Sequence, residues 1–199
     1  MFSTDARVAF APETTYRALI AQTTLPAWRA LLRPALVLLV LAVSLPITAV
    51  HNITLDLVLR SAAIFSALVL LQLGIGAIVI ATAPGRRVSF ARALDLWFAG
   101  HLPYNLWTLF LPFVTAVPFG PADSPHELMG ISIIAPFVWT AFVVAAFCRV
   151  VLDVTPGGAR RRVALHMAMV LVAGFALAIW AAGGAAALSS YLLRRVNGL

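Results

Sequence analysis

The stretch that decides the fold runs from residue 84 to residue 118 and reads PGRRVSFARALDLWFAGHLPYNLWTLFLPFVTAVP. Two arginines lie near its start, and an apolar run that is long enough to cross a bilayer follows. His101, Pro103 and Asn105 lie inside that run. Ionisable side chains cost about 2.5–3.5 kcal/mol at the centre of a membrane helix on insertion scales, so they usually face protein or water. The stretch therefore predicts an interior helix of a membrane-embedded bundle, kinked at Pro103.

The composition of the chain is typical of an integral membrane protein. Of its 199 residues, 62% are hydrophobic and only 11% are charged, and the mean hydropathy is +1.00. A soluble domain of this size carries more charge and less apolar surface. The formal net charge of +7 comes from arginines that flank the apolar runs, where they orient a membrane protein. We therefore expect no nucleic-acid partner.

Four further apolar runs accompany the first, and together they predict an all-α bundle with five transmembrane helices. The predicted spans are 34–50, 57–82, 96–117, 128–151 and 163–187. Before them, residues 1–27 have mixed polarity and one modest apolar face, which predicts an N-terminal helix lying on the cytoplasmic surface. The expected organisation is thus an N-terminal interfacial segment, 1–27, and a transmembrane domain, 28–199.

The arginines also predict the orientation. Placing the N-terminus in the cytoplasm puts eleven of the fourteen arginines on that side, which follows the positive-inside rule. Five crossings then send the C-terminus to the periplasm, although Arg194 and Arg195 near that end oppose the rule. The use of arginine without any lysine, together with abundant alanine, indicates a GC-rich bacterial genome. We expect a multi-pass protein of the bacterial inner membrane.

Small residues recur on two of the predicted helices at spacings that place them on one face. Such faces let helices approach closely in membranes. They predict helix-packing contacts at Gly74, Ala77 and Ala81, and at Gly174, Ala178, Ala182 and Ala186. The partners would be other integral membrane proteins or a second copy of the chain.

A polar stripe is predicted within the third span. His101, Asn105 and Thr108 lie at i, i+4 and i+7 and so share one helix face. The stripe predicts either a polar path for a proton, an ion or a lipid headgroup, or hydrogen bonds that fix the packing of neighbouring helices. Both alternatives remain open at this point.

Two basic segments border the predicted spans. They contain Arg86, Arg87 and Arg92, and Arg160, Arg161 and Arg162. Each arginine near the surface attracts anionic lipid headgroups by about 1 kcal/mol, although the same residues also serve to set the topology. Arg92 and Asp95 are three residues apart and are expected to form an ion pair.

The sequence indicates no catalytic residue, no metal site and no cofactor. The four histidines lack the HxxxH and ExxH spacings of metal-binding helices. Cys148 is the single cysteine, and no serine lies in a nucleophile-elbow sequence. His101 and His166 are the one pair of histidines expected at similar depth on facing helices, so haem ligation by this pair stays an alternative.

Several local features resemble one known family. They are Pro12 and Tyr16 in the N-terminal segment, then Trp28, Arg33 and Pro34, then SFARAL at 89–94 and GHLP at 100–103. This pattern resembles the bacterial members of the Ypt/Rab-interacting protein (YIP) domain family of five-span membrane proteins. The resemblance implies a helical bundle with a cytoplasmic N-terminus and no enzymatic activity. Eukaryotic members are tied to small GTPases and vesicle traffic.

The function expected from the sequence is that of a non-enzymatic accessory or scaffold subunit. It would bind lipids with anionic headgroups and other membrane proteins. Two alternatives come from other classes of protein. One is a transporter or channel subunit with a polar path along the third helix, and the other is a structural subunit of a redox or photosynthetic membrane complex.

Overall fold

The computed structural model describes residues 2–21, 27–50, 52–107, 110 and 132–181. Within these residues the chain is all-α, with seven α-helices and one 3-10 helix. The elements are α1 (Phe2–Phe10), α2 (Pro12–Ile20), η1 (Ala27–Leu31), α3 (Leu32–Val50), α4 (Leu55–Ala81), α5 (Phe90–Ala99), α8 (Ile134–Val150) and α9 (Pro156–Ala181). Residues 102–107 are also helical.

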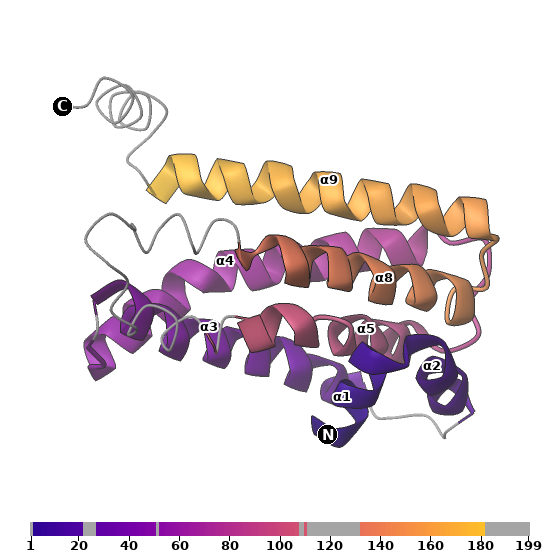
Figure 1. Ribbon diagram of the computed structural model, residues 1–199, viewed down its shortest axis with the longest axis horizontal. Coiled ribbons are helices and arrows are strands. Elements are labelled where there is room, and N and C mark those ends of the chain that lie inside the picture. The colour runs from indigo at the N-terminus through magenta and orange to yellow at the C-terminus, as the bar shows by residue number, and fades with distance from the viewer. Residues whose placement is uncertain (1, 22–26, 51, 108–109, 111–131, 182–199) are drawn as a thin grey trace.

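The long helices run side by side along the long axis of the molecule. Figure 1 shows α3, α4, α8 and α9 in this arrangement, with α5 between them and α1 and α2 at one end. Among the packed pairs are α3 with α4, α8 with α9, and α2 with α8. One hydrophobic core joins them, and it takes residues from α1 and α2 as well as from the long helices.

The short helix α5 occupies the centre of the bundle. The side chain of Ser89 accepts a hydrogen bond from the backbone N–H of Arg92 at 3.3 Å, which satisfies one free donor at the start of the helix. Seven of the ten residues of α5 are buried. A helix with so little exposed surface can pack on several neighbours at once, and α5 contacts α1, α3, α4 and α8.

The helix is interrupted close to Pro103, at residues 100–101, where the sequence predicts a kink. The backbone N–H groups of Gly100 and His101 bond to carbonyls three residues earlier, those of Trp97 and Phe98, at 3.1 Å each. This tightened turn ends α5. Pro103 then lies in the first turn of the helical segment 102–107, where a missing N–H costs no helix hydrogen bond.

The N-terminal segment differs from the expected surface helix, because it forms two helices that pack into the bundle. Tyr16 of α2 is fully buried, and its hydroxyl donates a hydrogen bond to the carbonyl oxygen of Leu96 at 3.3 Å. Burial raises the pKa of the Tyr16 phenol. From α8, the indole N–H of Trp139 donates to the carbonyl oxygen of Ala9 at 2.9 Å. The segment therefore closes one end of the helix bundle.

The length and composition of the helices test the predicted spans only in part. Among the described residues, α4 is the one helix long and apolar enough to cross a membrane, with 27 residues and a hydropathy of 2.5. Shorter apolar helices lie at Leu32–Ser44 and Ile134–Val150. The turn before Pro103 divides the third predicted span, and parts of the third, fourth and fifth lie outside the described residues. Five crossings are therefore not shown.

The close helix contact on α4 is made by Gly76 and not by the predicted Gly74. A Cβ atom at Gly76 would lie 2.7 Å from Nε1 of Trp97, whereas one at Gly74 would meet no atom within 4 Å. Ala77 is half-buried and Ala81 is exposed. On α9, Gly174 and Ala178 are helical, while Ala182 and Ala186 lie outside the described residues.

The different surroundings of Gly74 and Gly76 predict different effects of alanine substitution on stability, so one variant serves as the control for the other. Gly76→Ala should destabilise the protein by about 1–3 kcal/mol, because the added methyl group overlaps a tryptophan ring that is itself packed against other rings. Gly74→Ala should leave stability unchanged or raise it by up to about 1 kcal/mol, because alanine favours the helix and has open space. Unfolding of the two variants in detergent would measure both effects. Equal stabilities would contradict the assignment.

Candidate functional site

Two aspartates and two arginines form a buried ionic cluster, which consists of Asp5, Arg33, Arg92 and Asp95. Arg33 binds Oδ1 of Asp5 through Nη2 at 2.8 Å and through Nε at 3.1 Å, and its Nη1 pairs with Asp95. Nη1 of Arg92 donates to Oδ2 of Asp95 at 2.8 Å. None of the four side chains is more than 12% exposed. The charges balance, as buried ionic groups require.

The ionic cluster joins parts of the chain that are distant in sequence. Asp5 comes from α1, Arg33 from the start of α3, and Arg92 and Asp95 from α5. Arg92 also donates through Nη2 to the carbonyl oxygen of Leu19 in α2, at 3.3 Å. Burial alone lowers the pKa of Arg33, but its hydrogen bond with Asp5 and the charge of Asp95 outweigh burial and raise it. Through these ion pairs and hydrogen bonds, the cluster holds the N-terminal helices α1 and α2 against the bundle.

The sequence predicted only one contact of this cluster. The expected ion pair between Arg92 and Asp95 is present. Arg33, which directly precedes the first predicted span, is buried between two carboxylates. One signal in the sequence did point to this: Asp95 stands between apolar residues in LDLWF, where an unpaired carboxylate would be costly.

Removing one charge from the ionic cluster should be far more damaging than removing an exposed one. Asp95→Asn leaves Arg33 without its second carboxylate in the interior, so we expect a loss of about 3–5 kcal/mol of stability. Asp56→Asn is the matched control, because Asp56 and Arg60 form an ion pair with 67% and 74% of their side chains exposed. That change should cost less than about 1 kcal/mol.

Chemical or thermal unfolding of both variants in the same detergent would compare them. A loss of similar size in the two variants would show that the cluster contributes no more than a surface pair.

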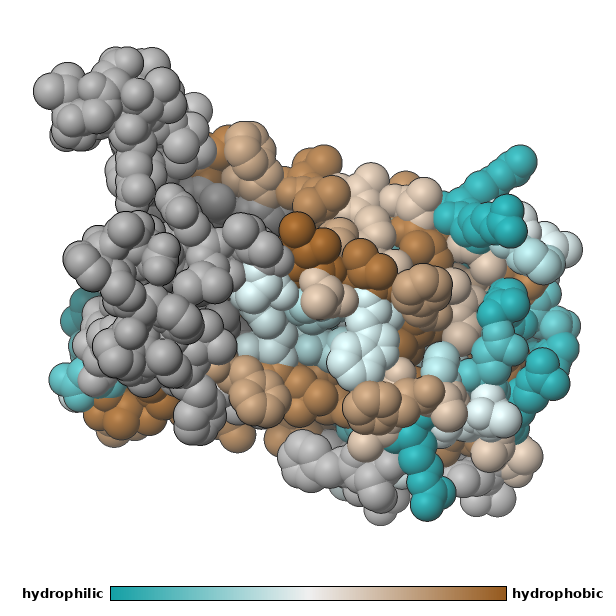
Figure 2. Space-filling view, viewed as in Figure 1, coloured by the Kyte–Doolittle hydropathy of each residue, from teal (hydrophilic) through white to brown (hydrophobic). Residues whose placement is uncertain are grey.

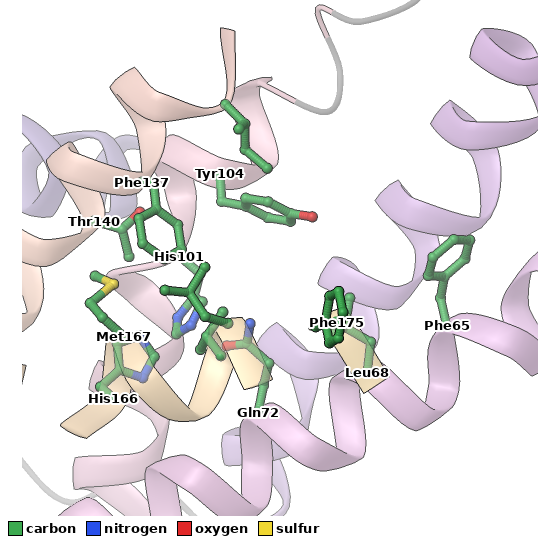
Figure 3. Close-up of a pocket in the computed structure, with 13 residues that line it drawn as sticks. Phe65, Leu68, Gln72, His101, Tyr104, Phe137, Thr140, His166, Met167 and Phe175 are labelled. Carbon is green, nitrogen blue, oxygen red and sulfur yellow. The ribbon is translucent and has the colours of Figure 1, made fainter. Parts of the chain in front are cut away.

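A cavity of about 470 Å³ lies between α4, α8, α9 and the segment that follows α5. Figure 3 shows His101, His166, Met167 and Thr140 close together, with Gln72 beside them. Most of the remaining lining is aliphatic or aromatic. Its size falls in the range of about 300–1,000 Å³ in which proteins bind small molecules.

Several polar atoms around this cavity are buried without a hydrogen-bond partner among the described residues. They are Nε2 of His101, Nδ1 of His166, Oγ1 of Thr140 and Oε1 of Gln72. Nδ1 of His101 lies 3.1 Å from the carbonyl oxygen of Trp97. A carbonyl only accepts, so Nδ1 carries the proton and Nε2 of the neutral ring is an acceptor. Buried polar atoms are normally paired, so four such atoms around one cavity need an explanation.

The aromatic contacts hold the two histidines in place. The ring of Trp97 lies against both imidazoles, with centroids 5.8 Å from His101 and 4.9 Å from His166. The two imidazoles meet edge to face at 6.2 Å. The sequence singled out this pair by its depth, and the fold brings the two residues together.

The predicted polar stripe does not line one continuous cavity in the described part of the chain. His101 faces the 470 Å³ cavity, whereas Asn105 lines a separate cavity of about 250 Å³ beside Asp5 and Arg33. Thr108 lies outside the described residues. The turn at residues 100–101 interrupts the regular helix just before these positions, whereas an unbroken helix would have kept them on one face.

The six arginines predicted to meet lipid headgroups have different environments. Arg86, Arg160 and Arg161 are exposed. Arg87 pairs with Asp153 in the turn after α8, and Arg92 is buried in the ionic cluster.

Arg162 serves as a cap for α4. Its guanidinium donates to the carbonyl oxygens of Val79, at 3.2 Å, and Thr82, at 2.6 Å. It also donates to the hydroxyl of Thr82 at 2.9 Å. The last carbonyls of a helix have no partner within it, so Arg162 satisfies groups that α4 leaves open.

Within the described ranges, no group of three or more His, Cys, Asp or Glu side chains is placed to hold a metal ion. Comparison of the chain with known proteins finds no matching family model, no matching curated protein and no matching solved structure. The resemblance to the YIP domain family thus rests on the sequence features given above.

Proposed function

We propose that the protein is an integral membrane protein of the bacterial inner membrane, a non-enzymatic accessory or scaffold subunit of YIP type. In this proposal it crosses the membrane five times, with a cytoplasmic N-terminus and a periplasmic C-terminus. It binds lipids and other membrane proteins, or a second copy of itself. One observation carries the proposal: large apolar side chains cover the outer faces of the long helices.

These exposed apolar side chains form what we call the apolar belt. Its members are Leu55, Leu59, Ile64, Leu70, Leu71 and Ile78 on α4, Ile134, Val138 and Phe142 on α8, and Leu165, Leu171, Val172 and Phe175 on α9. Only 28% of the most apolar window of α4 is buried. A soluble protein rarely exposes so much contiguous apolar surface, whereas a bilayer requires it.

The charge distribution supports the same proposal. Figure 2 shows apolar residues on either side of a paler, weakly polar band across the middle of one face, and strongly hydrophilic residues gathered mainly at one end. Arg86 and Arg87, in the loop after α4, and Arg160 and Arg161, at the start of α9, belong to that basic end. A belt of apolar surface that ends in arginines is suited to a bilayer with anionic headgroups on the cytoplasmic side.

The cavity at His101 is compatible with the transporter alternative. However, Asn105 lines a different cavity, so the described polar residues do not form one path. A cavity with a few polar atoms at one end and apolar walls is better suited to holding a ligand than to conducting ions. The scaffold and lipid-binding proposal is therefore favoured.

Cysteine labelling in intact cells tests the topology. In a Cys148→Ala background, Arg86→Cys and Arg160→Cys should resist a membrane-impermeant maleimide added from outside, because the proposal places both positions in the cytoplasm. Asn52→Cys, in the loop before α4, should react readily. The same positions labelled after lysis provide the control for reactivity. Outside labelling of Arg86→Cys and protection of Asn52→Cys would overturn the proposed orientation.

Binding of anionic lipid tests the role of the basic end. The triple variant Arg86→Gln, Arg160→Gln and Arg161→Gln should weaken retention of phosphatidylglycerol, because each exposed arginine contributes about 1 kcal/mol near a charged surface. The control is Arg60→Gln, which removes an exposed arginine from the opposite end of α4. Native mass spectrometry with a defined ratio of phosphatidylglycerol to phosphatidylcholine would measure retention. Equal loss in the triple variant and the control would contradict the proposal.

A further inference from the structure

The cavity around His101 has a polar end and an apolar end. On α4, Gln72 and Phe65 both line it and are seven residues apart, which is about 10 Å along the helix axis. On α9, His166 and Phe175 line it nine residues apart, or about 14 Å. Figure 3 shows His101 and His166 close to each other, with Phe65 and Phe175 away from them.

The polar end presents acceptors. Nε2 of His101 is an acceptor because Nδ1 donates to the carbonyl of Trp97. Oε1 of Gln72 is also an acceptor, and neither atom has a partner among the described residues. Thr140 adds a hydroxyl that can donate or accept, also unpaired within those residues. Nδ1 of His166 is a fourth unpaired atom at this end within the described residues, and the amide group of Gln72 can donate as well as accept. A hydroxyl group, which both donates and accepts, can therefore pair with this set.

We infer that this cavity binds an elongated, lipid-soluble molecule whose hydroxyl group donates to Nε2 of His101 and whose apolar body lies between α4 and α9 toward Phe65 and Phe175. The hydroxyl end meets Thr140 and Gln72 as well. Alkyl hydroquinones and the free hydroxyl of a diacylglycerol share this chemistry. The site is separate from the basic end, and binding at it does not depend on how the chain crosses a membrane.

A bare metal ion fits the cavity less well. Two imidazoles are close together, but no third His, Cys, Asp or Glu completes a ligand set in the described part of the chain. The volume of about 470 Å³ and the mostly apolar lining match a molecule of drug size rather than an ion. A hydroxylated amphiphile uses both the unpaired acceptors and the apolar walls.

Two probes, of which only one can donate a hydrogen bond, test the inference. The probes are 4-hexylphenol and 4-hexylanisole, in which a methoxy group replaces the hydroxyl. Isothermal titration calorimetry of the full chain in detergent, with a titration into empty micelles subtracted, would give both dissociation constants. We expect the phenol to bind about tenfold more tightly, which corresponds to about 1.4 kcal/mol and to the net value of one hydrogen bond.

Two variants assign the binding to the site. His101→Phe removes the acceptor. Thr140→Val removes a buried hydroxyl that makes no hydrogen bond within the described residues. Thr140→Val should therefore not impair folding. Each should weaken binding of the phenol about five- to tenfold and leave the anisole within about twofold. Gly74→Ala, outside the cavity, is the control and should bind like the unmodified chain.

Several results would overturn the inference. Equal affinity for the two probes, unchanged phenol binding in Thr140→Val, or no saturable binding of the phenol would each do so. Binding of Zn²⁺ or Cu⁺ that is lost in His101→Phe, in the absence of phenol binding, would assign the cavity to a metal instead. If the phenol binds as expected, titrations with decylhydroquinone and with 1,2-dioctanoylglycerol identify the natural source of the hydroxyl by which of the two binds more tightly.

Discussion

The carboxylate of Asp95 accepts hydrogen bonds from two guanidinium groups in the interior of the bundle, and the position of α5 depends on it. A buried carboxylate is stable only if it is paired, so Arg33 and Arg92 must lie where they do. Arg33 also holds Asp5, which brings α1 onto the bundle. A helix that is apolar on nearly every face could pack on its neighbours after rotation about its own axis. The paired charges of the cluster are formed in only one of these rotations. The ionic cluster therefore specifies the arrangement of the helices at this end and, through α5, the position of His101.

Residue patterns predicted the helices well and the ionic cluster poorly. The runs expected at 57–82 and 163–187 correspond to α4 and α9, because apolar runs of this length indicate helix rather than strand. The pair of Arg92 and Asp95 followed from a spacing of three residues. The contact between Arg33 and Asp95 joins residues 62 positions apart, and no local spacing predicts such a contact. The same holds for the packing of the N-terminal helices.

Parts of the candidate cavity were also visible in the sequence. His101 and His166 were paired by their expected depth, and the fold brings them into edge contact. Gln72 and Thr140 were not connected with them, because α4 and α8 are apolar on nearly every face and show no direction toward a partner. For the same reason the sequence could not choose between Gly74 and Gly76, which differ only in which one meets the ring of Trp97. For a helix that is apolar on every face, the sequence predicts the length but not which face contacts a given neighbour.

Arg162, about eighty positions away in the sequence, binds the carbonyl groups at the end of α4. With 27 residues, α4 is about 40 Å long, which exceeds a hydrocarbon thickness of about 30 Å. A helix of that length in a bilayer must tilt or extend into the headgroup region. Because Arg162 fixes the last carbonyls of α4 to the first turns of α9, the two helices would have to tilt together. In a thinner or thicker bilayer, α4 and α9 would then change their tilt as a pair, and neither helix could do so alone.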